Sequence, residues 1–226
     1  MKLDTQLDTL SLFSHELKTP LSVLQLGLNL LEKNFEKNKD MILLMKAELK
    51  FLNNLIHNIL DLRLIENKEK LLNYKWYNFN LILKEVCSSF NASAQQKNIC
   101  LDIQETQSIE VFVDEIWIAC VLRNLLSNAI RFSFDKKTIQ IKIKMKKDKL
   151  FCSITNKTSL KIDCEKVFDV FYTKSLKQQT KGTGLGLNLV KSILQVHGGE
   201  IGVKAIKEKV TFFFSLTKAR LAKKIA

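Results

Sequence analysis

The chain has 226 residues, of which 46% are hydrophobic, enough to bury one or two cores. No stretch approaches the roughly 18 uninterrupted apolar residues of a membrane span, and the amino-terminal residues predict an amphipathic helix interrupted by charge, not a signal peptide. The formal net charge is +13, but the lysines are spread along the whole chain, so nucleic-acid binding is not predicted.

Apolar periodicity in the first part of the chain predicts two long helices. From Leu3 to Phe35, apolar residues recur at alternating steps of four and three, which is a heptad seam with Ser14 as its polar member. After a polar break at 36–40, a second apolar stripe runs from Ile42 to Ile59. Two helices joined by a short loop predict an antiparallel hairpin.

A single hairpin of this kind leaves a stripe of leucine side chains in water. Pairing of two copies into a dimeric four-helix bundle with twofold symmetry buries that stripe, so we predict a homodimer. A monomer in which the rest of the chain covers the hairpin is the alternative, and the sequence pattern leaves it open.

The remainder of the chain alternates between helical and strand patterns. Residues 67–78 are polar and aromatic without helical period and are interpreted as a linker between a helical domain, 1–66, and a second domain, 79–226. Helices are predicted at 79–96, 114–132 and 184–197, and strands at 99–104, 110–113, 139–146, 150–155, 200–206 and 210–217. Helices stacked on one face of a mixed or mainly antiparallel sheet make the second domain α+β.

One histidine in the first helix lies in an unusual setting. His15 follows the seam position Ser14, so we expect it at the edge of the apolar stripe, where a partner can reach it. Pro20, the only proline in the chain, comes five residues later. Because proline lacks an N–H and clashes with the preceding turn, a kink is expected near Glu16. A histidine beside a kink suggests a function.

The segment around this histidine, FSHELKTPL at 13–21, resembles the H-box of bacterial sensor histidine kinases. The resemblance implies that His15 is phosphorylated and that Glu16 accepts its proton or orients its imidazole. It also implies that Thr19, four residues later on the same helical face, helps to orient a water that dephosphorylates the partner.

A second motif is glycine-rich. KGTGLGL at 181–187 has three glycines at alternate positions before a predicted helix, so its backbone can approach phosphates closely. Its spacing fits neither the dinucleotide fingerprint nor the P-loop. The longer run 182–199 resembles the G2 box of the histidine kinase and gyrase-like (Bergerat-type) ATPase fold. That resemblance implies nucleotide contacts from Gly182, Thr183, Gly184, Leu185, Gly186 and Leu187.

A third motif lies on the predicted helix 114–132. Asn124, Asn128 and Arg131 are spaced by four and three residues, so they share one helical face. Neutral oxygen donors suit Mg²⁺, which keeps most of its waters and bridges phosphates. RNLLSNAIRFS at 123–133 resembles the N-box of the same family. The resemblance implies that Asn128 holds Mg²⁺ with Asn124 beside it, that Arg131 lies near phosphate, and that Phe132 belongs to the nucleotide site.

Two further segments match the family unequally. VFDVFY at 167–172 resembles the F-box, which implies a lid over the nucleotide at 173–181. The lysines of this segment, Lys174 among them, could screen the charge of a triphosphate; a simply solvated loop is the alternative. The G1 box, an acid followed by spaced glycines, is altered. Asn156 replaces the aspartate that accepts a hydrogen bond from the adenine amino group, and Thr158 and Leu160 replace the glycines. A neutral asparagine oxygen still accepts that bond, but more weakly than a carboxylate.

Together these motifs imply a dimeric protein histidine kinase that uses ATP and Mg²⁺. The γ-phosphoryl group would pass to His15 and then to an aspartate of a response regulator. The expected location is cytoplasmic, as a free protein or as the cytoplasmic portion of a membrane-bound sensor. Two alternatives remain: a phosphatase or scaffold of the same fold, which the altered G1 box would suit, and a gyrase-like dimeric ATPase, in which the H-box has no purpose.

Overall fold

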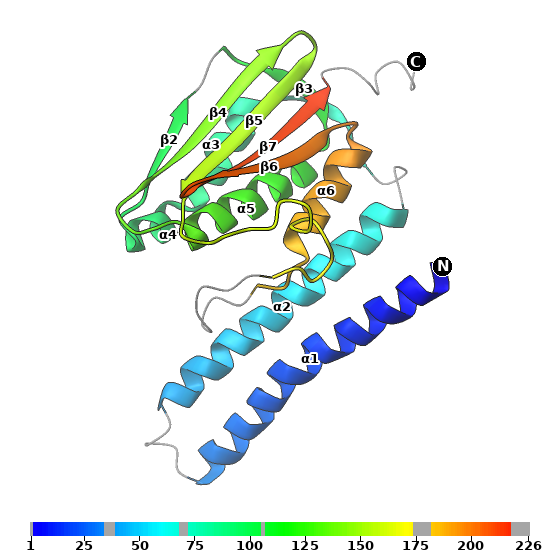
Figure 1. The fold of residues 1–226 in the computed structure, drawn as a ribbon, viewed down its shortest axis with the longest axis vertical. Coiled ribbons are helices and arrows are strands. Elements are labelled where there is room, and N and C mark those ends of the chain that lie inside the picture. Colours follow the sequence, from blue (N-terminus) through cyan, green and yellow to red (C-terminus); the bar gives the residue numbers. More distant parts are fainter. Residues whose placement is uncertain (1, 34–38, 68–71, 105–106, 174–181, 218–226) are drawn as a thin grey trace.

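The computed structural model describes residues 2–33, 39–67, 72–104, 107–173 and 182–217 (Figure 1). Within these ranges, the side chains of residues 2–13, 15, 32, 33, 39, 66 and 67 lie outside the described part. No helix in the described ranges is both long enough and apolar enough to cross a membrane.

The first two helices, α1 (Lys2–Lys33) and α2 (Lys39–Asn67), form the predicted antiparallel hairpin (Figure 1). Helix α1 continues through Pro20, which is buried. The two helices approach closely at Gly27, where an added Cβ would lie 2.5 Å from the sulfur of Met45. A side chain at this position would therefore push the helices apart.

The second part of the chain combines short helices with two sheets. The helices are α3 (Phe79–Ser89), α4 (Asn91–Gln96), α5 (Glu115–Phe132) and α6 (Gly186–Val196). The strands are β1 (Lys75–Asn78), β2 (Cys100–Gln104), β3 (Glu110–Val113), β4 (Thr138–Lys146), β5 (Lys149–Lys157), β6 (Glu200–Ile206) and β7 (Lys209–Thr217).

The main sheet has the order β2-β4-β5-β7-β6 and is mixed, because β2 pairs in parallel with β4 while the other pairs are antiparallel. Helices α3, α5 and α6 lie on one face of it (Figure 1). The alternating strand β4 turns Ile139, Ile141 and Ile143 into the core at no more than 1% exposure, and its lysines outward. The predicted α+β class, with helices on one face of a mixed sheet, is confirmed.

Three boundaries differ from the prediction. The helix predicted at 79–96 breaks at Phe90, whose N–H bonds Cys87 O in a tight turn. The last four residues of the predicted linker form β1, which pairs with β3. Helix α6 begins at Gly186, because Gly184 adopts φ +68°, a left-handed conformation incompatible with a regular helix.

The start of α5 is tied to the end of α6 through a buried histidine. Asp114 caps α5, its carboxylate accepting hydrogen bonds from the N–H groups of Ile116 and Trp117. The backbone N–H of Asp114 donates to Nε2 of His197, and Nδ1 of His197 lies 2.8 Å from Ile193 O. An imidazole that accepts at Nε2 and donates at Nδ1 is neutral. Burial correspondingly lowers the pKa of His197.

This histidine predicts how stability depends on pH. Unfolded His197 takes up a proton near its ordinary pKa of about 6.5, whereas the folded form does so only at lower pH. Between these values the unfolded state binds more protons, so the free energy of unfolding falls as the pH drops below about 6.5. Urea titrations between pH 7.5 and 5 measure this slope.

We expect His197→Gln to reduce that pH slope. The exposed His57 provides the matched control, because His57→Gln leaves the buried contact intact. An equal slope in wild type and His197→Gln would contradict the assignment of the acid sensitivity to His197.

Candidate functional site

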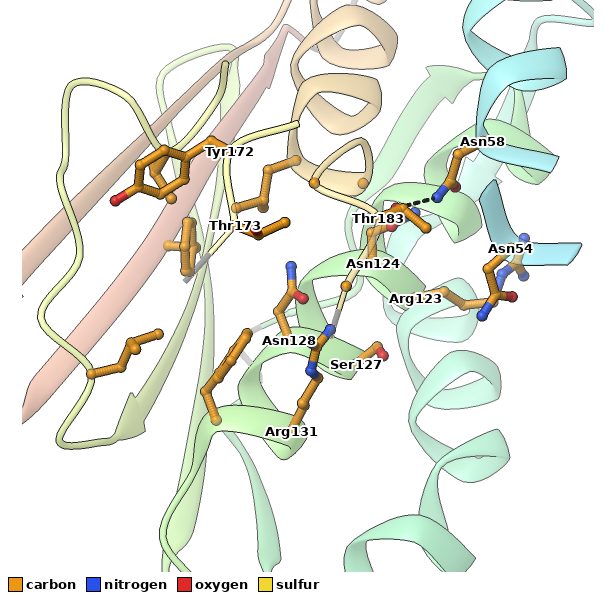
Figure 2. A pocket seen from close by; sticks show the side chains of 18 of the residues that line it. Asn54, Asn58, Arg123, Asn124, Ser127, Asn128, Arg131, Tyr172, Thr173 and Thr183 are labelled. Carbon is orange, nitrogen blue, oxygen red and sulfur yellow. Dashed lines mark hydrogen bonds between the residues drawn. The ribbon is translucent and has the colours of Figure 1, made fainter. Parts of the chain in front are cut away.

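A cavity of about 910 Å³ opens between the sheet domain and helix α2 (Figure 2). Its walls come from α5, the loop before α6, the ends of β5 and β7, the segment 158–173 and one face of α2. This volume lies in the range of small-molecule and cofactor sites.

The polar face of α5 forms one wall of the cavity. Asn124, Asn128 and Arg131 all line it, in the order expected from their helical spacing (Figure 2). The amide nitrogen of Asn124 donates to Cys120 O at 3.0 Å, which leaves its Oδ1 toward Gly186. Three polar side chains from one helix therefore line the same cavity.

Arg131 places a positive charge in this wall. Its guanidinium lies 4.7 Å from the centre of the Phe132 ring, and burial lowers its pKa, although an arginine stays charged at any physiological pH. Among the described residues, no carboxylate pairs with it. Lys97 holds the end of α5 in place, because its ammonium donates to Ile130 O and Arg131 O. A fixed, partly buried cation without a counter-ion suits a phosphate group.

The glycines of the loop 182–187 are required by their neighbours. A Cβ on Gly182 would lie 2.5 Å from Nη1 of Arg131, and one on Gly186 would lie 2.5 Å from Oδ1 of Asn124. A Cβ on Gly184, which has φ +68°, would meet the backbone of Phe171 at 2.5 Å. The loop therefore lies directly on the polar face of α5.

The start of α6 is open for an anion. Its N-cap residue, Leu185, makes no side-chain capping bond to the helix. Thr183 instead accepts a weak bond of 3.4 Å from Leu185 N–H. The first N–H groups of a helix carry partial positive charge, so this end, beside Arg131, favours phosphate.

The segment 167–172 is packed as a support for the loop. The ring of Phe168 lies edge-on to Phe212 at 6.3 Å, and Phe168 O accepts a hydrogen bond from the amide of Asn188 on α6. Tyr172 accepts a hydrogen bond from Asp163 N–H through its hydroxyl. These contacts fix the backbone at Phe171 on which Gly184 rests.

The apolar end of the cavity contains one buried amide. Asn156, 3% exposed, lies on β5 opposite Val210 of β7, and both residues line the cavity. Its Nδ2 is buried without a hydrogen-bond partner among the described residues. Leaving such a donor unpaired costs about 1–3 kcal/mol, so the geometry fits a ligand with a polar edge at this point.

Helix α2 closes the cavity from the other side, which the sequence did not predict. Asn58 donates from Nδ2 to Oγ1 of Thr183 at 3.0 Å (Figure 2). Phe51 and Leu55 of α2 form a small buried cluster with Leu185. No local pattern announces these contacts, because they join segments 125 residues apart.

The predicted site residues fall into four groups. Those that line the cavity are Asn124, Asn128, Arg131, Phe132, Asn156, Gly182, Thr183, Gly184, Gly186 and Leu187. Leu185 was predicted to contact nucleotide, but it does not line the cavity; it is 1% exposed and packs on α2, because its side chain points away from the loop's open face. Glu16 and Thr19 lie on α1, away from the cavity lining. The side chain of His15, and all of Lys174, lie outside the described residues.

Two protein-family models match the chain. Residues 5–68 match the His Kinase A (phospho-acceptor) domain, and residues 113–220 match the histidine kinase-, DNA gyrase B-, and HSP90-like ATPase. The first covers the hairpin and the second covers the cavity walls formed by α5 and the glycine-rich loop.

Similar proteins carry both parts. The sensor protein DltS of Streptococcus agalactiae serotype V is 30% identical over 199 residues, covering 87% of this chain but only half of DltS. The histidine kinase AdeS of Acinetobacter baumannii has a similar structure, with a TM-score of 0.75 and 25% identity over 90% of this chain and 98% of that one. The histidine kinase ThkA, solved in complex with the response regulator protein TrrA, has a TM-score of 0.79 and 25% identity over 96% of this chain and 63% of that one. The chain thus belongs to the two-component sensor histidine kinases.

Proposed function

We propose that this chain is the catalytic core of a sensor histidine kinase, which transfers the γ-phosphoryl group of ATP to His15 and then to an aspartate of a response regulator. The observation that carries the proposal is the cavity itself, where α5 and the glycine-rich loop meet a helix of the hairpin that carries His15. We assign residues 1–66 to dimerisation and phosphotransfer, 67–78 to the linker and 79–226 to nucleotide binding.

The hairpin supplies the acceptor. A ring nitrogen of His15 attacks the γ-phosphorus of ATP, the bond from that phosphorus to the β–γ bridging oxygen breaks, and ADP leaves. Glu16, the next residue, accepts the proton lost from the ring or holds the imidazole in its nucleophilic tautomer. Thr19 lies one turn later on the same helix and is exposed, so a water beside it can be reached by a bound regulator.

The cavity supplies the donor. Arg131 and the free N–H groups at the start of α6 bind phosphate oxygens, and Asn156 meets the base at the apolar end. Asn128 would hold Mg²⁺ through its amide oxygen, with Asn124 beside it. The donor set fits, because neutral amide oxygens suit Mg²⁺. The metal supplies neutralisation of the phosphate charge. Positioning and charge complementarity then provide most of the rate.

The exposed seam of the hairpin and the similar proteins indicate the partners of this chain. Four seam residues remain in water in the single chain: Leu21 at 52% exposure, Leu28 at 55%, Leu49 at 53% and Ile56 at 46%. Pairing with a second hairpin covers them, which supports the homodimer over the covered monomer. The ThkA complex with a response regulator supports a receiver domain as the phosphoryl acceptor. We place the activity in the cytoplasm, where ATP and receiver domains occur.

One specific observation favours the alternative of a phosphatase or scaffold with the same fold. Asn156, Thr158 and Leu160 replace the acid and both glycines of the G1 box, which suits a weakened kinase that acts as a phosphatase or scaffold. The intact cavity and its phosphate-binding groups favour the kinase. A gyrase-like ATPase is not favoured, because residues 5–68 match the phospho-acceptor domain.

Labelling with γ-³²P-ATP and Mg²⁺ tests the kinase directly. We expect wild type to incorporate acid-labile, base-stable label, as a phosphoramidate does, and His15→Gln to incorporate none. His57→Gln is the matched control, because His57 is exposed on α2 and has no acid or proline after it. A folded, dimeric wild type that takes up no label would contradict the kinase and favour the phosphatase or scaffold.

The metal assignment predicts a shift in magnesium dependence. Asn128→Ala removes the amide oxygen, so the Mg²⁺ concentration for half-maximal nucleotide binding should rise by roughly 10- to 100-fold. Titration of Mg²⁺ at fixed ATP measures this, with the exposed Asn53→Ala as control. An unchanged Mg²⁺ requirement in Asn128→Ala would remove this residue from the metal site.

A single charged substitution on the heptad seam tests the proposed homodimer. Leu28→Glu places an unpaired carboxylate in the interface, which should raise the dissociation constant roughly 100-fold or more, for a cost of about 3 kcal/mol. Light scattering across a dilution series measures the mass. The neighbouring exposed Asn29→Glu adds the same charge off the seam and should leave the dimer intact. A monomeric wild type would refute the dimer.

A further inference from the structure

Asn156 lines the cavity at the end where the proposed function places the base. It sits in β5, which is paired with β7 at Val210, and the next residue, Lys157, accepts a hydrogen bond from Phe134 N–H through its carbonyl. Side chains alternate along the strand, so Asn156 is turned inward while Lys157 is exposed. The amide is therefore carried by a fixed backbone.

The surroundings of this amide are mainly apolar. Leu160, Ile162, Val167, Val210 and Phe212 line the same end of the cavity. The nearby Thr158 hydroxyl is engaged in its own turn, where it accepts a hydrogen bond from Leu160 N–H at 3.1 Å. Asn156 is thus the group left to select a polar edge, and its Nδ2 is buried without a partner among the described residues.

An amide and a carboxylate select differently. A carboxylate only accepts hydrogen bonds, so it attracts the 6-amino group of adenine and repels a 6-oxo group. An amide has one accepting and one donating side, and its terminal torsion is roughly two-fold, so a half-turn exchanges the two.

In one orientation of the Asn156 amide, Oδ1 accepts a hydrogen bond from the 6-amino group of a purine while Nδ2 donates one to the purine's N1. In the other orientation, Nδ2 donates a hydrogen bond to a 6-oxo group while Oδ1 accepts one from the protonated N1. Both arrangements make two hydrogen bonds, and both give the buried Nδ2 an acceptor.

We infer that Asn156 makes the base pocket accept purine nucleotides with either an amino or an oxo group at carbon 6. This inference rests on the proposed function, because it takes the cavity to hold a nucleoside triphosphate. It goes further by making the residue at 156 the determinant of base selectivity in this chain.

Equilibrium binding of ATP and ITP to the full chain, with Mg²⁺ and without turnover, tests the inference. ITP carries the 6-oxo group but no 2-amino group, so it probes the edge that faces Asn156 and adds no bulk elsewhere. We expect the two dissociation constants for wild type to agree within tenfold. In Asn156→Asp, ITP should weaken relative to ATP by at least a further tenfold, since a bidentate contact discriminates on that scale.

Lys157→Gln is the matched control, because it changes the net charge by the same amount on the outward side of β5 and should leave the ATP to ITP ratio unchanged. Thermal unfolding verifies that Asn156→Asp is folded, and the wild-type ratio decides the question without it. A wild-type preference for ATP above tenfold, or a ratio that Asn156→Asp shifts by less than tenfold, would overturn the inference and leave the kinase standing. Failure of wild type to bind either nucleotide would overturn both.

Discussion

The close approach of the loop 182–187 to helix α5 is the contact on which the site depends. Gly182 lies against Arg131 and Gly186 against Asn124, at separations where a Cβ would collide with the side chain. Because the loop is this close, the first N–H groups of α6 and the polar face of α5 open on the same space. Any larger residue at these positions would push the two walls of the cavity apart.

The same loop also joins the two parts of the chain. Its glycines face α5, while Thr183 bonds Asn58 and Leu185 packs among Phe51 and Leu55 of α2. Six consecutive residues therefore carry both one wall of the cavity and the contact with the hairpin. Because the loop is packed on both sides, a displacement at one surface would have to be accommodated at the other.

The end of the cavity that we propose for the base is built differently. There strands line the cavity in place of a loop, and the buried polar group is Asn156 of β5, which pairs with Val210 of β7. Replacement of the family's acid and glycines by Asn156, Thr158 and Leu160 leaves the cavity open. The fold therefore keeps its cavity although these three residues differ from the family pattern.

The sequence by itself determined most helices and strands and which side chains share a face of each, because these depend on short-range periodicity. The heptad seam predicted the hairpin. The steps of four and three predicted that Asn124, Asn128 and Arg131 share one side of α5, and all three line the cavity. Alternation in β4 likewise predicted which side chains enter the core.

Only the tertiary structure decided which segments meet. Four features depend on contacts between residues far apart in the chain. They are the pairing of β1 with β3, the burial of a neutral His197, the packing of Leu185 against α2 and the closure of the cavity by α2. Such contacts are set by packing of whole elements, and no repeat within one segment encodes them.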